Sequence, residues 1–229
     1  MTVATLALAS YAIVDIADAG SRKTITTRTT FRIGSNNNSG AARGGGFAHC
    51  DPANMLITEN LDMVTIVPGN SVNCYGGNGT PEHSYGRSHD LSIGSTAGLP
   101  LELSCVHFAM AELSADVTAT VKVYLDTNDT PGPTGSGSDL WFLGSTTVSL
   151  TTTPATTYAA SFSAPVILDP DSLIFVEIII PELFPGTHEI GSNVGGESSP
   201  TWLKTTNGDC GIGSWINPSA LGFPNMHIL

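Results

Sequence analysis

The chain has 229 residues and a mass of 23.7 kDa, and 41% of its residues are hydrophobic while only 12% are charged. Its 25 Gly and 14 Pro residues are unfavourable inside helices, so the composition excludes a helical bundle or a coiled coil. The formal net charge of −12 excludes a basic nucleic-acid-binding protein, because such proteins contact phosphates through clustered Lys and Arg. We therefore expect a β-rich protein with no nucleic-acid partner.

Residues 1–20 form an apolar arm with two open interpretations. The first twelve residues read MTVATLALASYA, which is either the remnant of a signal peptide without its basic n-region or a genuine β-strand. A retained apolar arm must be buried, on its own domain or on a neighbouring subunit, which makes Val3, Leu6 and Leu8 candidate subunit contacts. No apolar run reaches the roughly 18 residues of a transmembrane helix, so we expect no membrane span.

Residues 21–98 are rich in Gly and Asn, with predicted strands at residues 24–33 and 61–67 and polar loops at residues 34–46 and 68–90.

Charge is divided unevenly along the chain. Residues 1–87 hold six basic and six acidic residues, whereas residues 88–229 hold two basic and fourteen acidic ones. Arg22 and Lys23 thus precede an acidic body, and they either dock on another subunit or stay solvated on an intramolecular strand.

Residues 99–229 are predicted to form the core of the fold. Runs of β-branched and aromatic residues, bounded by Gly, Pro, Asn or Asp, predict strands at residues 101–113, 118–126, 139–150, 157–168 and 172–181. The last run is apolar on both faces, which predicts a central strand. With no helical period between them, these strands indicate an all-β fold, an antiparallel two-sheet sandwich that is jelly-roll-like and carries an N-terminal extended arm. Residues 21–229 are expected to be one domain.

The four cysteines predict disulfide bonds. Cys50, Cys74, Cys105 and Cys210 form no CxxC pair, so neither a zinc ribbon nor a thioredoxin-like motif finds support. An even number of cysteines in a chain with few charges favours two disulfides in an oxidising compartment, and hence an extracellular or cell-surface location. Three connectivities stay open, and free cysteines in a cytosolic protein are the alternative.

Two segments offer possible metal ligands. The loop at Asp126, Asn128 and Asp129 supplies hard oxygens suited to Ca²⁺, although a solvated Asx-turn accounts equally for these residues. We expect no other cofactor. His83, His89 and Asp90 are close in sequence, but their spacing matches no familiar set of metal ligands.

Catalytic motifs are missing from the sequence, and the aromatic residues suggest a binding role instead. There is no GxSxG elbow, HExxH pair or Walker loop, so we do not expect an enzyme. Trp202 and Trp215 flank the loop of Cys210 and are candidates for stacking on sugar rings. Trp141 lies inside a predicted strand and is assigned to the core.

A series of landmarks in residues 93–229 resembles a known module. The landmarks are ATVKVYLDTN at residues 119–128, FSAPV at residues 162–166, FVEI at residues 175–178, IGSN at residues 190–193, DCG at residues 209–211 and LGFPNMH at residues 221–227. In their order they resemble a β-sandwich module of exported proteins from planctomycetes and related bacteria, which often lies beside dockerin-type or sorting-anchor segments. The resemblance implies secretion and a non-catalytic display or structural role, and it supplies no active-site residues.

The sequence therefore predicts a secreted, non-catalytic structural or adhesive protein, a subunit of a fibre or surface layer joined by its N-terminal arm. Its main partner is then another copy of the chain, in a homo-oligomer or polymer. The alternative is a carbohydrate-binding module with a glycan partner. Assembly should depend on residues 1–20, whereas glycan binding should depend on exposed aromatic side chains.

Overall fold

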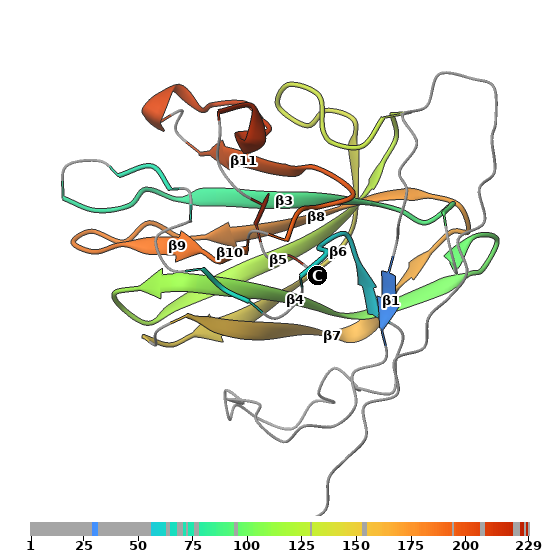
Figure 1. The fold of residues 1–229 in the computed structure, drawn as a ribbon, viewed down its shortest axis with the longest axis horizontal. Helices are drawn as coiled ribbons and strands as arrows, with labels where there is room; N and C mark the ends of the chain where they lie inside the picture. Colours follow the sequence, from blue (N-terminus) through green and yellow to red (C-terminus); the bar gives the residue numbers. More distant parts are fainter. Residues whose placement is uncertain are drawn as a thin grey trace, which may run out of the picture.

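A computed structural model of the chain shows an all-β fold in which two antiparallel sheets pack together (Figure 1). The structure describes residues 29–31, 56–62, 65–67, 71, 73–75, 78–93, 96–128, 130–152, 155–193, 195–206, 209–221, 225–226 and 228. No α-helix occurs among them, and the predicted sandwich is confirmed. The strands are β1 (Thr29–Phe31), β2 (Leu56–Thr58), β3 (His83–Asp90), β4 (Leu101–Leu113), β5 (Val117–Asp126), β6 (Leu140–Leu150), β7 (Thr156–Leu168), β8 (Leu173–Ile180), β9 (His188–Ile190), β10 (Ser192–Asn193), β11 (Thr201–Thr205) and β12 (Asn225–Met226).

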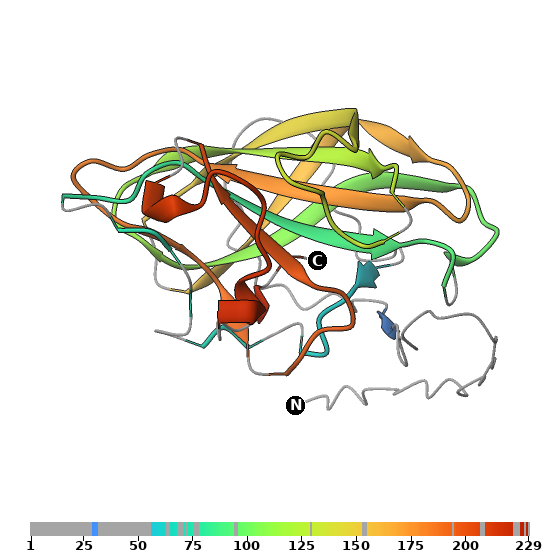
Figure 2. The ribbon, with the colours of Figure 1, turned by 90° about the horizontal axis from the view of Figure 1, so that it is seen from above.

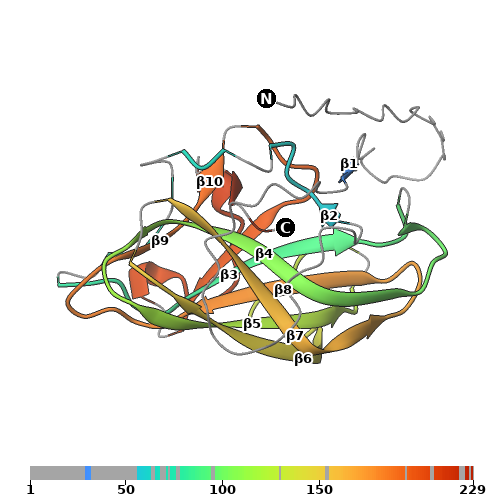
Figure 3. The same cartoon turned by 90° about the horizontal axis from the view of Figure 1, so that it is seen from below.

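The larger sheet has the strand order β11-β3-β8-β5-β6, and the smaller one has the order β7-β4-β9. Two short ladders, β1-β2 and β10-β12, complete the described sheets, and two 3-10 helices, η2 (Asp209–Gly211) and η3 (Pro218–Leu221), follow β11. Figures 2 and 3 show β6 and β7 running along the same side of the sandwich, one from each sheet. This side is the one on which both main sheets end in a long strand.

The core lies between the two sheets and follows the alternation of the strands. Tyr85 of β3, Val121 of β5 and Ile178 of β8 share one face of the larger sheet and are fully buried. They pack in one cluster with Phe108 of β4, which comes from the smaller sheet. Burying these side chains contributes about 1.5–3 kcal/mol each. A second cluster around Leu168 extends the core towards the end where β7 finishes.

The five strands predicted between residues 101 and 181 are confirmed as β4, β5, β6, β7 and β8, with small shifts at their ends. The run predicted to be a central strand is β8, which lies between β3 and β5. It is buried along most of its length because both of its edges and its inner face are covered by protein. The predicted strand at residues 24–33 contains β1.

Two expectations for the first hundred residues are wrong. The described residues of the segment 61–67 form no strand: Asp62 Oδ1 accepts the backbone N–H of Thr65 at 3.0 Å, and Val67 donates its backbone N–H to the carbonyl oxygen of Ser192 at 2.9 Å. The strand nearby is β2, which pairs with β1. Conversely, β3 occupies part of the predicted loop 68–90. The sequence did not predict this strand because its buried positions include polar side chains such as Arg87 and His89, so it shows no alternation of apolar and polar residues.

Candidate functional site

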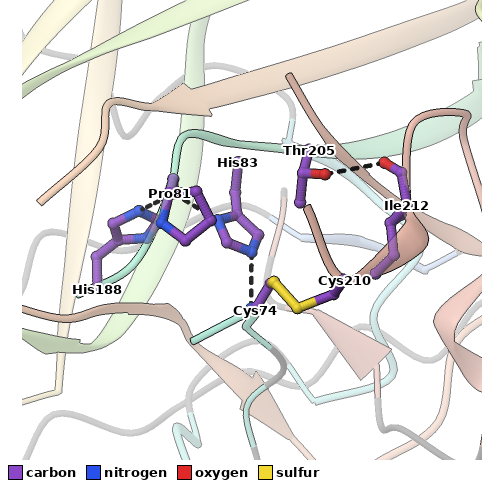
Figure 4. The surroundings of a disulfide bond; sticks show 7 residues. All are labelled: Cys74, Pro81, His83, His188, Thr205, Cys210 and Ile212. Carbon is purple, nitrogen blue, oxygen red and sulfur yellow. Dashed lines mark hydrogen bonds between the residues drawn. A yellow bond between two sulfur atoms is a disulfide. The ribbon is translucent and has the colours of Figure 1, made fainter. Parts of the chain in front are cut away.

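A disulfide bond ties the segment before β3 to the loop after β11. Cys74 and Cys210 are bonded across 136 residues, with their Cα atoms 6.0 Å apart (Figure 4). Cys105 is also disulfide-bonded, whereas Cys50 lies outside the described residues. The expectation of disulfide bonding is therefore confirmed for three of the four cysteines. On the Cys210 side, Thr205 donates its hydroxyl hydrogen to the carbonyl oxygen of Ile212 at 3.0 Å and closes the loop.

Two buried histidines support this disulfide. His83 Nε2 accepts the backbone N–H of Cys74 at 2.8 Å, and Nδ1 of the same ring lies 2.7 Å from the carbonyl oxygen of Pro81 (Figure 4). A ring nitrogen that accepts an N–H carries no proton, so His83 is neutral with its proton on Nδ1. His188 Nε2 donates to the same Pro81 oxygen at 3.1 Å. Burial lowers the pKa of His188 to about 3.

The histidines noted in the sequence are not brought together as metal ligands. His83 and His89 lie at opposite ends of β3, opposite Ile180 and Ile174 of β8, so about 20 Å of extended backbone separates them. His89 lies instead near Glu59, with Nδ1 3.7 Å from Oε1. In the part of the chain that the structure describes, no group of three or more His, Cys, Asp or Glu side chains is placed to share a metal ion.

The candidate calcium loop is held by its own hydrogen bonds. Asp126 is buried and accepts the backbone N–H groups of Asn128 and Gly132 at 3.3 and 3.1 Å. Asp139 accepts the backbone N–H of Thr134 at 2.8 Å and a side-chain N–H of Asn128. Because N–H donors face these oxygens, the geometry favours the Asx-turn interpretation. Burial raises the pKa of Asp126 to about 6. Asp129 lies outside the described residues, and calcium binding stays a prediction.

Trp215 is buried and Trp202 half-buried, so little of either indole ring is exposed for the predicted stacking on sugar rings. Trp215 is only 6% exposed, packs edge-on against Phe175 with ring centroids 5.0 Å apart, and lies under the Lys204 ammonium group at 4.6 Å. Trp202 is half-buried against Gly132, where a Cβ atom would come within 1.9 Å of the indole ring. Gly132 also has φ +106°, a conformation that favours glycine.

The exposed tryptophan is Trp141, which the sequence assigned to the core. It is 71% exposed, and its neighbour Phe142 is 52% exposed. Both lie at the start of β6, where the register with β5 shifts between Val123 and Tyr124 and leaves one extra residue in β6. A bulge of this kind bends an edge strand and redirects its side chains. The alternation of side chains along a regular strand does not predict a bulge, so the sequence analysis assigned Trp141 to the core.

The end of β7 adjoins the same corner. A Cβ atom on Gly144 of β6 would lie 2.8 Å from the Val166 side chain of β7, so the two strands meet here. The next residue, Ile167, is 63% exposed. Trp141, Phe142 and Ile167 therefore present apolar surface at the side of the sandwich where both sheets end.

Two outer strands of the main sheets are covered by other parts of the chain. Along β11, Leu203 and Thr205 donate their backbone N–H groups to Ile216 and Ile212, each at 2.9 Å. β9 is three residues long, and the side chain of Asn73 donates to its His188 carbonyl oxygen at 3.2 Å. Covering an edge in this way prevents its pairing with another chain.

The other two outer strands, β6 and β7, are long and contain no charged residue. β7 carries Pro165, and its pairing with β4 shifts register between Leu103 and Cys105, which leaves a bulge. Proline and bulges are features that keep an edge strand from pairing further. β6 has neither a proline nor a charged residue, and β5 is the one strand with which it pairs among those described.

A buried ion pair joins β3 to two segments near the C-terminus. Arg87 of β3 is fully buried, and its Nη2 lies 2.6 Å from Glu197 Oε2 and donates to the carbonyl oxygen of Met226 at 3.0 Å. Desolvation lowers the pKa of Arg87 and raises the pKa of Glu197. The pair holds the segments of Glu197 and Met226 against β3 and closes that side of the core.

Comparison with protein-family models, with curated proteins and with solved structures finds no match to this chain. Among the described residues, no helix has the length and apolar character needed to cross a membrane. The candidate subunit contacts Val3, Leu6, Leu8, Arg22 and Lys23 all lie outside the described residues. The one surface that the structure adds to the sequence-based candidates is the β6 edge with its exposed Trp141.

Proposed function

We propose that the protein is a non-catalytic extracellular subunit with a structural or adhesive role, which assembles into a fibre or surface layer through its N-terminal arm. The observation that carries this proposal is the uncharged side of the sandwich at β6 and β7, where no further strand among the described residues pairs with either edge. An unpaired strand offers a row of N–H and C=O groups to another chain, and natural proteins protect such edges unless they use them. Adding a strand there supplies those hydrogen bonds.

The disulfide supports the proposed location. The Cys74–Cys210 bond is compatible with an extracellular protein, because disulfides persist in oxidising compartments. The resemblance of residues 93–229 to exported modules supports the same location. The large negative charge of the body keeps free copies apart in solution, so that assembly depends on a specific contact.

The arm has the composition that such a contact requires. Residues 1–14 contain no charged side chain, Asp15 and Asp18 follow, and residues 21–32 then carry four basic residues, with Arg22 and Lys23 first, and no acidic one. The body, residues 88–229, holds fourteen acidic residues against two basic ones. An apolar strand that precedes a basic segment therefore suits an apolar edge on an acidic body.

The test compares the full chain with a chain that lacks residues 1–20 and with the double variant Leu6→Asp/Leu8→Asp, by electron microscopy and light scattering. We expect filaments or large oligomers from the full chain and monomers from both altered forms. The point variant guards against a folding defect in the truncated chain, and circular dichroism reports the fold of each. Monomers in all three forms, or assembly that survives both changes, would contradict the proposal.

A carbohydrate-binding module is the second candidate, and the exposed Trp141 favours it. An indole ring that is 71% exposed beside Phe142 offers a flat apolar face on which a sugar ring can stack. A glycan array probed with the wild-type protein and with Trp141→Ala tests this function. Binding that is lost in the variant and kept without residues 1–20 would favour the glycan module over the arm-joined subunit.

A further inference from the structure

We infer that β6 is the acceptor strand of the assembly, and that it receives residues 2–14 of a second copy as a further strand of the larger sheet. This inference rests on the proposed function, because it requires an arm that joins subunits. It adds the strand, the backbone groups and the side of the sheet at which the joint forms. Each of these follows from the hydrogen-bonding parity of the larger sheet.

Parity across the sheet can be followed from one edge to the other. On β11, the N–H groups of Leu203 and Thr205 bond to the segment beyond the sheet, so they face away from β3. In antiparallel ladders, bonded and non-bonded pairs alternate along each strand. Carrying this alternation through the registers of β3, β8 and β5 places the bonded β5-β6 pairs at Val121–Thr146 and Ala119–Val148.

The opposite end of β6 gives the same result independently. Thr127 donates its backbone N–H to the carbonyl oxygen of Asp139 at 3.0 Å, one step beyond the Asp126–Leu140 pair. The Leu125–Trp141 pair is then bonded, and Phe142 faces outwards. The backbone groups that face away from β5 therefore belong to a small set of residues with exposed side chains. They are Phe142, Ser145, Thr147 and Ser149.

β6 is a better acceptor than β7. An incoming strand needs a continuous row of free N–H and C=O groups. On β7, Pro165 and the bulge restrict that row to residues 156–161, where the Ser161 carbonyl oxygen already accepts the Thr146 hydroxyl of β6 at 2.8 Å. The bulge of β6 lies near its start, which leaves Ser145 to Leu150 in regular register with β5. Six residues in one register are enough for a strand of ordinary length.

Charge favours the arm of a second copy, and not its β6 strand, as the strand that pairs with β6. Pairing β6 with β6 would place two acidic bodies edge to edge. In an antiparallel pair, Asp139 at the start of one β6 would approach the end of the other β6. There Asp116 accepts the backbone N–H of Thr152, which follows that strand. Like charges at such an edge are repulsive. The arm carries no charge over residues 1–14, and the two acidic residues that follow it are outnumbered by the four basic ones of residues 21–32, which include Arg22 and Lys23.

Length and composition agree with this assignment. Residues 2–14 number thirteen, and β6 has eleven residues. The arm is apolar or small at both alternating sets of positions, with Leu6 and Leu8 on one and Val3 on the other. A strand added beyond β6 meets apolar surface on both faces, since Val148 lies partly buried towards the core and Phe142 is exposed.

The test places a proline in the outward row. In the full chain, Thr147→Pro removes an N–H that faces away from β5, so the native β5-β6 bonds remain, whereas an incoming strand loses a hydrogen bond and meets the ring. Thr147→Val keeps the N–H and the branched shape and is the matched control. We expect Thr147→Pro to raise the critical concentration for assembly at least tenfold and Thr147→Val to leave it unchanged.

Amide hydrogen exchange gives a second readout that does not depend on the proline variant folding. In the wild-type assembly we expect the amides of Phe142, Ser145, Thr147 and Ser149 to exchange at least tenfold more slowly than in Leu6→Asp/Leu8→Asp. Unchanged exchange at these amides would overturn the inference. If arm variants abolish assembly while Thr147→Pro does not, the acceptor is elsewhere and the proposed function stands. Assembly that needs β6 and survives loss of residues 1–20 would identify β6 of a second copy as the occupant and overturn the inference.

Discussion

At the scale of single residues, the interior of this sandwich holds polar and charged side chains that a sequence pattern does not reveal. β3 alone contributes His83, Arg87 and His89 to buried positions. Arg87 pairs with Glu197 and His89 lies near Glu59, so these two residues join parts of the chain that are far apart in sequence, whereas His83 contacts the nearby Cys74. Burying the Arg87–Glu197 pair is costly because its charges are desolvated, and Nε and Nη1 of Arg87 have no hydrogen-bond partner among the described residues.

Removing one member of the Arg87–Glu197 pair should be strongly destabilising. Arg87→Ala leaves the Glu197 carboxylate without its cation and opens a cavity in β3, so we expect the free energy of unfolding to fall by about 3–5 kcal/mol. Urea denaturation followed by tryptophan fluorescence measures this loss. The double variant Arg87→Met/Glu197→Leu is the control and should recover part of it. A single variant as stable as the wild type would show that the pair does not hold β3.

His188 should make the fold sensitive to acid. Its folded pKa is about 3, below the ordinary value of 6.5, so the unfolded chain binds more protons between these two values. The His188 contribution to stability is therefore complete above about pH 6.5 and is lost as pH falls towards 3, with a slope of up to about 1.4 kcal/mol per pH unit.

The measurement for His188 is the difference between wild type and His188→Gln in urea denaturation at several pH values from 7 to 4. The amide of Gln retains a donor for the Pro81 carbonyl oxygen and does not titrate. Other groups, such as Asp126 with its raised pKa of about 6, contribute equally to both proteins and cancel. The stability difference between the two proteins should shift in favour of His188→Gln as pH falls, and a difference that stays constant would refute the assignment.

At the scale of elements, the sequence predicted the strands that have apolar alternation and missed those that lack it. β4 to β8 follow from runs of Val, Ile, Leu and Phe between turn residues. β3 and β9 to β12 are short or polar, and they exist because neighbouring strands and the disulfide hold them. The exposure of Trp141 depends on a register shift in β6, and the burial of Trp215 depends on a loop that returns to the sheet. Neither follows from local pattern, because both are tertiary contacts.

The Cys74–Cys210 bond should account for a large share of the stability. It closes a loop across 136 residues, and the chain-entropy model assigns such a bond about 5 kcal/mol. We expect the double variant Cys74→Ala/Cys210→Ala to lose several kcal/mol of unfolding free energy, measured by urea denaturation under oxidising conditions. Under a strong reductant the gap between wild type and variant should close. A variant as stable as the oxidised wild type would show that β3 and the Cys210 loop are held by other contacts.

At the scale of the whole molecule, charge and edge geometry together define how copies can meet. The body is acidic, and the described long edge without charge, proline or cover is that of β6. Copies that approach through any other acidic face repel one another at low salt. An arm that pairs with β6 satisfies the hydrogen bonds of that edge, and the basic residues that follow the arm reduce the repulsion between acidic bodies.

This combination predicts a specific salt dependence. Reversing two charges with Arg22→Glu/Lys23→Glu replaces attraction between the arm and the body with repulsion, so the critical concentration for assembly should rise at least about tenfold at 10 mM salt. The Debye length falls from about 30 Å at 0.01 M to about 3 Å at 1 M, so the difference from wild type should disappear at about 1 M NaCl. Light scattering across a salt series measures both limits. The charge-keeping swap Arg22→Lys/Lys23→Arg should assemble like wild type, and if it fails as the reversal does, these residues make specific contacts in place of the long-range attraction argued above.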